Sequence, residues 1–362
     1  MPDAKSLGRQ ARALGPEVIQ QIHRRMVELA VENKVVQGRK MRVDTTVVET
    51  NIHYPTDSTL LGDGMRVLTR LMRKVTSIAG TAGTKLRDRM RSVGRHVMQI
   101  ARAARIKGDK GKEKLQPIYR KLLAITGRVV AQAKRFSAEI ASGVKRARGA
   151  RKRAALQQLK GKIDTMVSRT QQVVRQTKAR VLDGNEHFES KLLSVFETST
   201  EVIRKGKASK PTEFGKMVKI QEAENQIIID FEVYEKKPND SDLLIPSIET
   251  HQALLGRTPH LVAGDAGFYS AKNETKAHEM GVRRVSVPNR STKSPARRKH
   301  QKQRWFKKGQ KWRTGCEGRI SLLKRRHGLT RSRYRGQAGM TRWVGLGVIA
   351  DNLINIGTAM AK

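Results

Sequence analysis

The sequence predicts a mixed α/β fold that carries a long, mostly helical insertion after its first strand. Two observations indicate this. Residues 60–210 place apolar side chains three and four residues apart, as on one side of a helix. Residues 40–51 and the chain after residue 210 contain short runs rich in Val, Ile and Thr, which are typical of strands. We therefore divide the chain into an N-terminal helical segment (1–39), an α/β domain (40–59 and 211–362) and a basic helical insertion (60–210).

Five segments have the composition of strands, which predicts a five-stranded sheet. They are residues 40–51, 213–221, 226–234, 259–267 and 282–287. Glu224-Asn225 would form the hairpin turn between the second and the third. Helices are expected within 1–37, from Asp240 to Leu255, at 270–281, from near Gly315, and at 340–360, where an apolar helix would pack on the sheet. Residues 286–310 are expected to be a basic loop.

The predicted insertion contains three narrow apolar seams, at 86–104, 115–129 and 156–173. Three or four long antiparallel helices would bury these seams, as a bundle or a coiled-coil arm. Residues 60–210 also carry 37 Lys or Arg against 11 Asp or Glu. Two interpretations remain open for this charge: the helices contact DNA, or they form a solvated spacer without a ligand.

The composition of the whole chain points to a polyanionic partner. Its 362 residues have a formal charge of +43 at pH 7. Nucleic acid is the first candidate and an anionic membrane surface the second. No apolar run reaches the roughly 20 residues that span a bilayer, and the N-terminus lacks the apolar core of a secretion signal. A single cysteine excludes an internal disulfide and a cysteine-rich zinc site, which fits the cytoplasm.

Three carboxylates stand out in this basic chain. Residues 283–335 contain 20 Lys or Arg and one acid, Glu317. By itself, Glu317 has two equally good explanations: it is either an acid at a helix start, where it suits the helix dipole, or a functional carboxylate. However, Asp44 lies inside an apolar strand, where Asp is unfavourable, and Asp265 ends a second one. Three acids that meet at one end of a sheet would bind hard divalent cations, and two such ions clamp the attacking and leaving oxygens of a phosphodiester.

Three motifs resemble the DDE transposases of bacterial insertion sequences, and most closely the group called ISNCY. The motifs are Arg42-Val-Asp-Thr-Thr-Val-Val-Glu-Thr-Asn-Ile-His-Tyr-Pro-Thr-Asp-Ser58, Gly264-Asp-Ala-Gly-Phe-Tyr-Ser270, and the stretch from Cys316-Glu-Gly-Arg to Tyr334-Arg-Gly336. The resemblance covers most of the chain from about residue 20. It implies an RNase H-like fold, and it implies that Asp44, Asp265 and Glu317 are the catalytic, metal-binding residues.

The resemblance also implies the cofactor and the partners. The expected cofactor is Mg²⁺ or Mn²⁺, with two ions. The expected partner is double-stranded DNA, both the terminal inverted repeats and the target, bound by a homodimer in the bacterial cytoplasm at the nucleoid. Arg313 and Lys324 fit the Tyr-x2-Arg-x3-Glu-x6-Lys pattern of these transposases, whereas Gln310 stands at the Tyr position. The chain begins 43 residues before Asp44, so we expect the usual helix-turn-helix region to be short or missing.

The basic segment predicts the residues that contact DNA phosphates. These are Arg313, Arg319, Lys324, Arg325, Arg326, Arg331, Arg333 and Arg335. Other polar residues are assigned to structure: Cys316 to packing, and Glu49 to the sheet face opposite Asp44. Trp305 and Trp312 either stack on bases or belong to the core.

Three functions remain to be distinguished. The first is metal-dependent cleavage and strand transfer on DNA. The second is a catalytically inactive, nucleic-acid-binding remnant of a transposase, and the third is another RNase H-like nuclease, such as a junction resolvase. The presence of all three acids disfavours the second function, and the Arg-x3-Glu-x6-Lys pattern disfavours the third.

Overall fold

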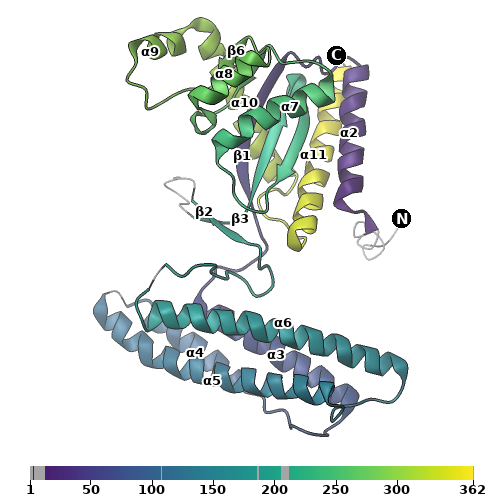
Figure 1. Cartoon of the computed structure of the whole chain (residues 1–362), viewed down its shortest axis with the longest axis vertical. Helices are drawn as coiled ribbons and strands as arrows, with labels where there is room; N and C mark the ends of the chain where they lie inside the picture. The colour runs from purple at the N-terminus through teal and green to yellow at the C-terminus, as the bar shows by residue number, and fades with distance from the viewer. Residues whose placement is uncertain (1–2, 4–12, 107, 186, 205–211, 362) are drawn as a thin grey trace. The chain divides into compact units, whose positions relative to one another are not determined.

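The computed structural model describes residues 3, 13–106, 108–185, 187–204 and 212–361. The chain forms two compact units, of which Met1–Asn51 together with Ser199–Lys362 make one and Ile52–Thr198 make the other. The first unit contains a β-sheet with helices, and the second is helical (Figure 1).

Within the described residues, a six-stranded mixed sheet forms the centre of the first unit. Its strands are β1 (Lys40–Glu49), β2 (Glu201–Ile203), β3 (Glu213–Glu222), β4 (Ile228–Val233), β5 (Leu261–Ala263) and β6 (Arg284–Ser286). On one side β1 pairs antiparallel with β3, on the other it pairs parallel with β5, and β6 is parallel to β5. Strands β2 and β4 both pair antiparallel with β3. This mixed α/β arrangement is consistent with an RNase H-like fold.

The sheet has one strand more than the sequence predicted. Strand β2 has only three residues, too few to show a period, and it lies inside the segment assigned to the helical insertion. The hairpin between β3 and β4 is as predicted. Its turn, Glu224–Gln226, places Asn225 at a φ of 52°, in the left-handed region that Asn tolerates better than most residues.

Helices cover both faces of the sheet. On one face, α7 (Leu244–Leu255) and α8 (Ala271–Glu279) pack on a cluster that contains Val43 and Val262. On the other face, α10 (Arg304–Arg326) and α11 (Gly336–Met360) pack on a cluster that contains Val48 and Val218. Because successive strand residues point to opposite faces, Asp44 shares the face of Val48 and therefore lies under α10. The remaining helices are α2 (Pro16–Glu32), which packs against α11, and α9 (Pro295–Lys302) (Figure 1).

Residues 286–310 are more ordered than the predicted basic loop. They contain α9 and the beginning of α10, so α10 starts at Arg304 rather than near Gly315. Gly309 and Gly315 lowered the helical propensity of this segment. In the folded chain they let α10 approach its neighbours: a Cβ on Gly309 would lie 2.6 Å from the Ser286 hydroxyl oxygen.

Helix α11 differs from the sequence expectation in one respect. Among the described residues it is long and apolar enough, by length and composition alone, to cross a membrane. Core helices of soluble proteins meet the same criterion, and α11 buries Met340, Val344 and Val348 against the sheet. The prediction that this helix packs on the sheet is therefore confirmed.

The second unit is built from four helices in its described part. They are α3 (Asp57–Ala79), α4 (Met90–Ala103), α5 (Asp109–Ala141) and α6 (Ala150–Val181). All of them contribute to one apolar cluster, with Leu68, Val93, Phe136 and Ile163 among its buried members. The N-terminus of α3 is capped by Thr56, while Asp57 pairs with Arg180 at 2.5 Å.

Candidate active site

A cleft of about 620 Å³ lies on the α10 side of the sheet. Its lining includes the three predicted carboxylates, Asp44, Asp265 and Glu317, together with Lys324 and Arg325. These residues come from the middle of β1, from the carboxyl end of β5 and from α10. The structure therefore brings together three acids that are separated by 221 and 52 residues in the chain.

Asp44 is held in place by its own strand. Between Met41 and Glu49 every residue except Asp44 is buried, because β1 is covered on both faces. The Asp44 Oδ1 accepts a hydrogen bond of 2.7 Å from the backbone N–H of Thr45. The other carboxylate oxygen, Oδ2, lies 3.7 Å from Nη1 of Arg313. One oxygen of the Asp44 carboxylate is therefore held by a backbone N–H group, and the other faces the Arg313 guanidinium.

Asp265 follows β5 after a single glycine, Gly264. Its Oδ1 accepts a hydrogen bond of 2.8 Å from the backbone N–H of Gly267 and so caps the short 3₁₀ helix Ala266–Phe268. This turn ends the strand and points the carboxylate into the cleft at the carboxyl edge of the parallel strands, the usual position of site residues in such sheets.

Glu317 lies in the middle of α10, and 55% of its side chain is exposed. The helix continues through Gly315, so Arg313 and Glu317 are one turn apart on the same face. Arg313 Nη2 donates to Glu317 Oε1 at 2.8 Å. Glu317 is consequently the most accessible of the three acids.

Arg313 links two of the three carboxylates. Its guanidinium contacts both Asp44 and Glu317, and only 12% of its side chain is exposed. In the described part of the chain, no three His, Cys, Asp or Glu side chains lie close enough together to hold one metal ion. The carboxylate oxygens are nevertheless the hard donors that Mg²⁺ prefers. The donor chemistry of the cleft fits a divalent cation, and Arg313 balances part of its negative charge.

Comparison with known protein families bears on this cleft. Residues 272–356 match the family model described as a transposase DDE domain. The match supports a DDE transposase family and DNA as its substrate. It includes Glu317, Arg313 and Lys324, whereas Asp44 and Asp265 lie outside it. Searches of curated proteins and of solved structures found no match to the chain.

Gln310 stands at the Tyr position of the Tyr-x2-Arg-x3-Glu-x6-Lys pattern, and it joins α10 to the sheet. Its Nε2 donates to the backbone oxygens of Gly264 at 3.2 Å and Ser286 at 2.5 Å. Gly264 directly precedes Asp265, and Ser286 is the last residue of β6. Gln310 thus positions the helix that carries Glu317 against the strand end that carries Asp265.

A buried polar cluster lies beneath the cleft. Arg42, on β1, donates from Nη2 to Glu222 at 2.5 Å and from Nη1 to the backbone oxygen of Trp312 at 2.5 Å. Burial raises the pKa of the Glu222 carboxyl, and the Arg42 guanidinium opposes this shift. Cys316 is fully buried beside this pair, and burial raises the pKa of its thiol. The assignment of Cys316 to packing is confirmed.

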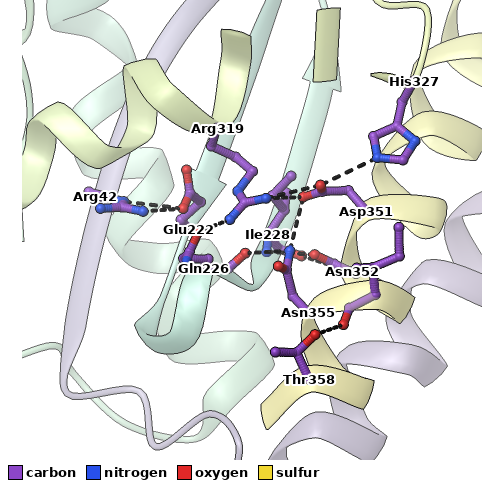
Figure 2. Close-up of polar contacts among 11 residues, drawn as sticks. Arg42, Glu222, Gln226, Ile228, Arg319, His327, Asp351, Asn352, Asn355 and Thr358 are labelled. Atoms are coloured by element: carbon purple, nitrogen blue, oxygen red, sulfur yellow. Dashed lines mark hydrogen bonds and ion pairs between the residues drawn. The ribbon is translucent and has the colours of Figure 1, made fainter. Parts of the chain in front are cut away.

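A second buried polar cluster joins α10 to α11. Arg319 Nη1 donates to both carboxylate oxygens of Asp351, on α11, at 3.0 Å, and 3% of each side chain is exposed. Figure 2 shows that His327, Asn355 and Gln226 complete this cluster. Arg319 was predicted to contact DNA, but its guanidinium points into the protein and already has a carboxylate partner. We therefore leave Arg319 out of the DNA-binding set.

Of the other predicted DNA contacts, Arg313 is largely buried against Asp44 and Glu317, whereas the rest remain accessible to differing degrees. Arg325, Arg326, Arg331, Arg333 and Arg335 are exposed, and Lys324 is half-buried in the wall of the cleft. Arg331 also contacts Glu49 at 2.9 Å. This pairing supports the assignment of Glu49 to structure rather than to metal binding.

Asp240 is an acid near the site that the sequence did not single out. It accepts a hydrogen bond of 3.0 Å from the hydroxyl of Thr45, the residue after Asp44. A Cβ built on Gly267 would lie 3.1 Å from both Asp240 Oδ2 and Asp265 Oδ1. In the sequence, Asp240-Ser241-Asp242 has the pattern of a helix start. This pattern explains Asp240 as a capping residue and gives no sign that it lies near the other acids.

Gly315 and Gly318 provide a matched test of how tightly α10 packs over the cleft. A Cβ on Gly315 would lie 2.3 Å from Arg42 Nη1, whereas a Cβ on Gly318 would meet no atom within 4 Å. Gly315→Ala is expected to lower the free energy of unfolding by about 1–3 kcal/mol through overpacking. Gly318→Ala is expected to raise it by about 0.5–1 kcal/mol, because Ala favours a helix interior.

Urea denaturation followed by tryptophan fluorescence would measure both effects. All three tryptophans, Trp305, Trp312 and Trp343, belong to the unit that contains the sheet, so their emission reports on that unit. If the two substitutions changed the free energy of unfolding equally and in the same direction, this result would contradict the close approach of Arg42 to α10.

Proposed function

We propose that the chain is a DDE transposase of the ISNCY group that cleaves DNA at the ends of an insertion sequence and joins those ends to a target. The observation that carries this proposal is the cleft lined by Asp44, Asp265 and Glu317 together with Lys324 and Arg325. It combines the acids needed to bind metal with cations that suit a phosphodiester. The match of residues 272–356 to a transposase DDE domain supports the same reaction class.

Asp44, Asp265 and Glu317 are the residues that would hold Mg²⁺ or Mn²⁺. Two such ions, when bound, supply the activation of the nucleophile and the stabilisation of the leaving oxygen. Two of the three acids are already oriented by backbone N–H groups, those of Thr45 and Gly267. The other carboxylate oxygen of Asp44 lies 3.7 Å from Arg313. Asp240 accepts a hydrogen bond from Thr45 and lies near Asp265, so it adds negative charge close to the cleft.

The reaction proceeds in two displacements at phosphorus. Water forms a bond to the phosphorus at the end of the element, and the bond to the 3′ oxygen breaks. The freed 3′-hydroxyl then attacks a phosphodiester of the target, the bond from that phosphorus to the target's own 3′ oxygen breaks, and the attacking hydroxyl's proton passes to that leaving oxygen. Lys324 and Arg325, which are adjacent on α10 in the wall of the cleft, bind the DNA phosphates. Arg313 orients Glu317 toward Asp44 through its contacts with both.

The helical unit serves DNA binding in this proposal. This unit, Ile52–Thr198, lies in the sequence between the first strand and the rest of the catalytic domain, and the predicted insertion at 60–210 carries 37 Lys or Arg against 11 Asp or Glu. Such a surface binds the DNA backbone by displacing its counterions, so its affinity falls steeply with salt.

The proposed function is tested by cleavage of duplex DNA that contains the inverted repeats flanking the reading frame. The full-length protein is expected to nick this DNA in the presence of Mg²⁺ or Mn²⁺ and to remain inactive with EDTA. A protein that binds the same DNA tightly but does not cut it in either metal would support the catalytically inactive remnant instead. Cleavage of a four-way junction in preference to the repeats would support a resolvase.

A further inference from the structure

A second basic cleft lies at the opposite end of the parallel strands from the carboxylates. Its volume is about 470 Å³, and its walls come from the first residues of β1, β5 and β6 and from the first half of α10. Five cationic side chains line it: Arg39, Lys40, Arg283, Arg284 and Lys308. No carboxylate lines this cleft. The cations are exposed, and none forms an ion pair with a carboxylate in the described part of the chain.

The five cations differ in this respect from the largely buried arginines of the same unit. Arg42, Arg297 and Arg319, from the same unit, are each paired with a carboxylate. Five like charges around one cavity repel each other unless an anion is bound. Glu224 accepts hydrogen bonds from the backbone N–H groups of Arg39 and Lys40 and offsets part of this charge, and the remaining positive charge matches several phosphates in succession.

Two tryptophans give the cleft an apolar, flat surface as well. Trp305 and Trp312 are both half-buried in its wall, seven residues apart on α10, which places them on one face two turns apart. Arg284 lies 5.6 Å from the centroid of the Trp305 ring. Aromatic rings beside cations are the combination that holds unpaired nucleotides, because the ring stacks on the base while the cations hold the backbone.

We propose that this cleft binds an unpaired nucleotide of a DNA strand, with its base against a tryptophan and its neighbouring phosphates on the five cations. Double-stranded DNA would not place a base against either tryptophan, because the faces of paired bases are covered by their neighbours in the stack. Lys308 and Glu317 are nine residues apart on one continuous helix, about 14 Å along its axis. That distance corresponds to about four nucleotides of DNA. A DNA strand that joined the two clefts would have to be longer than this, because nine residues of helix also turn the two side chains to opposite faces of α10.

This inference goes beyond the proposed reaction and requires neither metal nor cleavage. Its test is the binding of a short fluorescent oligothymidine and of an abasic oligomer of the same length, in EDTA. Both oligomers carry the same phosphates, so the difference between their affinities measures the contribution of base stacking. The wild-type protein is expected to bind oligothymidine at least about fivefold more tightly. Trp305→Leu combined with Trp312→Leu is expected to remove this preference, while Trp343→Phe, outside the cleft, retains it.

The cations have a separate test that does not depend on the tryptophan variant folding. Arg283→Gln combined with Arg284→Gln is expected to weaken binding of both oligomers equally and to reduce the salt slope by about 1.4. The matched control, Lys272→Gln with Lys276→Gln, removes the same charge from the exposed surface of α8 and should leave the slope unchanged.

Three results would overturn the proposal. The first is a base preference that persists without Trp305 and Trp312, and the second is an equal effect of the α8 control on the salt slope. The third is saturation of the tryptophan emission by thymidine monophosphate at concentrations as low as those of the oligomer, which would indicate a site for free nucleotides. A failure to cleave DNA would leave all these measurements interpretable.

Discussion

Glu317→Gln is expected to lower the rate of DNA cleavage by at least about 100-fold while DNA affinity stays unchanged. The substitution keeps the shape of the side chain and removes a charge that the proposed reaction needs to bind metal. Loss of a group that merely supports a metal ligand costs roughly 10- to 100-fold, so loss of a ligand costs at least the upper value. The measurement is single-turnover cleavage of the inverted-repeat duplex, with binding measured separately.

Glu279→Gln is the matched control for this experiment. Glu279 is exposed at the end of α8 and does not line the carboxylate cleft, so the change removes the same charge from the protein. It is expected to leave cleavage unaffected. Cleavage by Glu317→Gln at the wild-type rate would show that α10 contributes no ligand and that its basic residues form only a binding surface.

Asp351→Ala is expected to lower the free energy of unfolding of the sheet-containing unit by about 3–5 kcal/mol. It would leave the buried Arg319 guanidinium without its carboxylate, and an uncompensated buried charge has this cost. The loss is a large fraction of the about 5–15 kcal/mol that holds a typical domain folded. Urea denaturation followed by tryptophan emission would measure it.

The double substitution Arg319→Met with Asp351→Leu separates charge from packing. Removing both charges eliminates the uncompensated guanidinium, so stability should return to within about 1–2 kcal/mol of the wild type. If the double variant were as unstable as Asp351→Ala, the loss would come from packing of α11 against α10 rather than from the buried charge.

The strand positions of two acids could be predicted from the sequence because each is locally anomalous. Asp44 interrupts a run of Val and Thr, and Asp265 ends a short apolar strand just before a glycine-containing turn. Polar residues in good strands conflict with local propensity, and such conflicts concentrate at functional sites. The structure then brings both acids to one cleft with Glu317.

Other features depended on contacts that are distant in sequence. Arg319 is surrounded by exposed arginines in the chain, and its partner Asp351 lies 32 residues away on another helix. Gly315 has the signature of a helix breaker, yet it is needed inside α10 because Arg42, from β1, approaches it closely. Only the packing of α10 on the sheet distinguishes these residues from surface arginines and loop glycines.

The most direct test of the shared carboxylate site is a Mn²⁺ titration of the full-length protein, followed by the electron paramagnetic resonance of the free ion. The wild type is expected to bind Mn²⁺ in competition with Mg²⁺. Asp44→Asn, Asp265→Asn and Glu317→Gln are each expected to weaken this binding by at least about tenfold, with Glu279→Gln as the unaffected control. Mn²⁺ affinities equal to the wild type in all three variants would contradict a metal site formed by Asp44, Asp265 and Glu317.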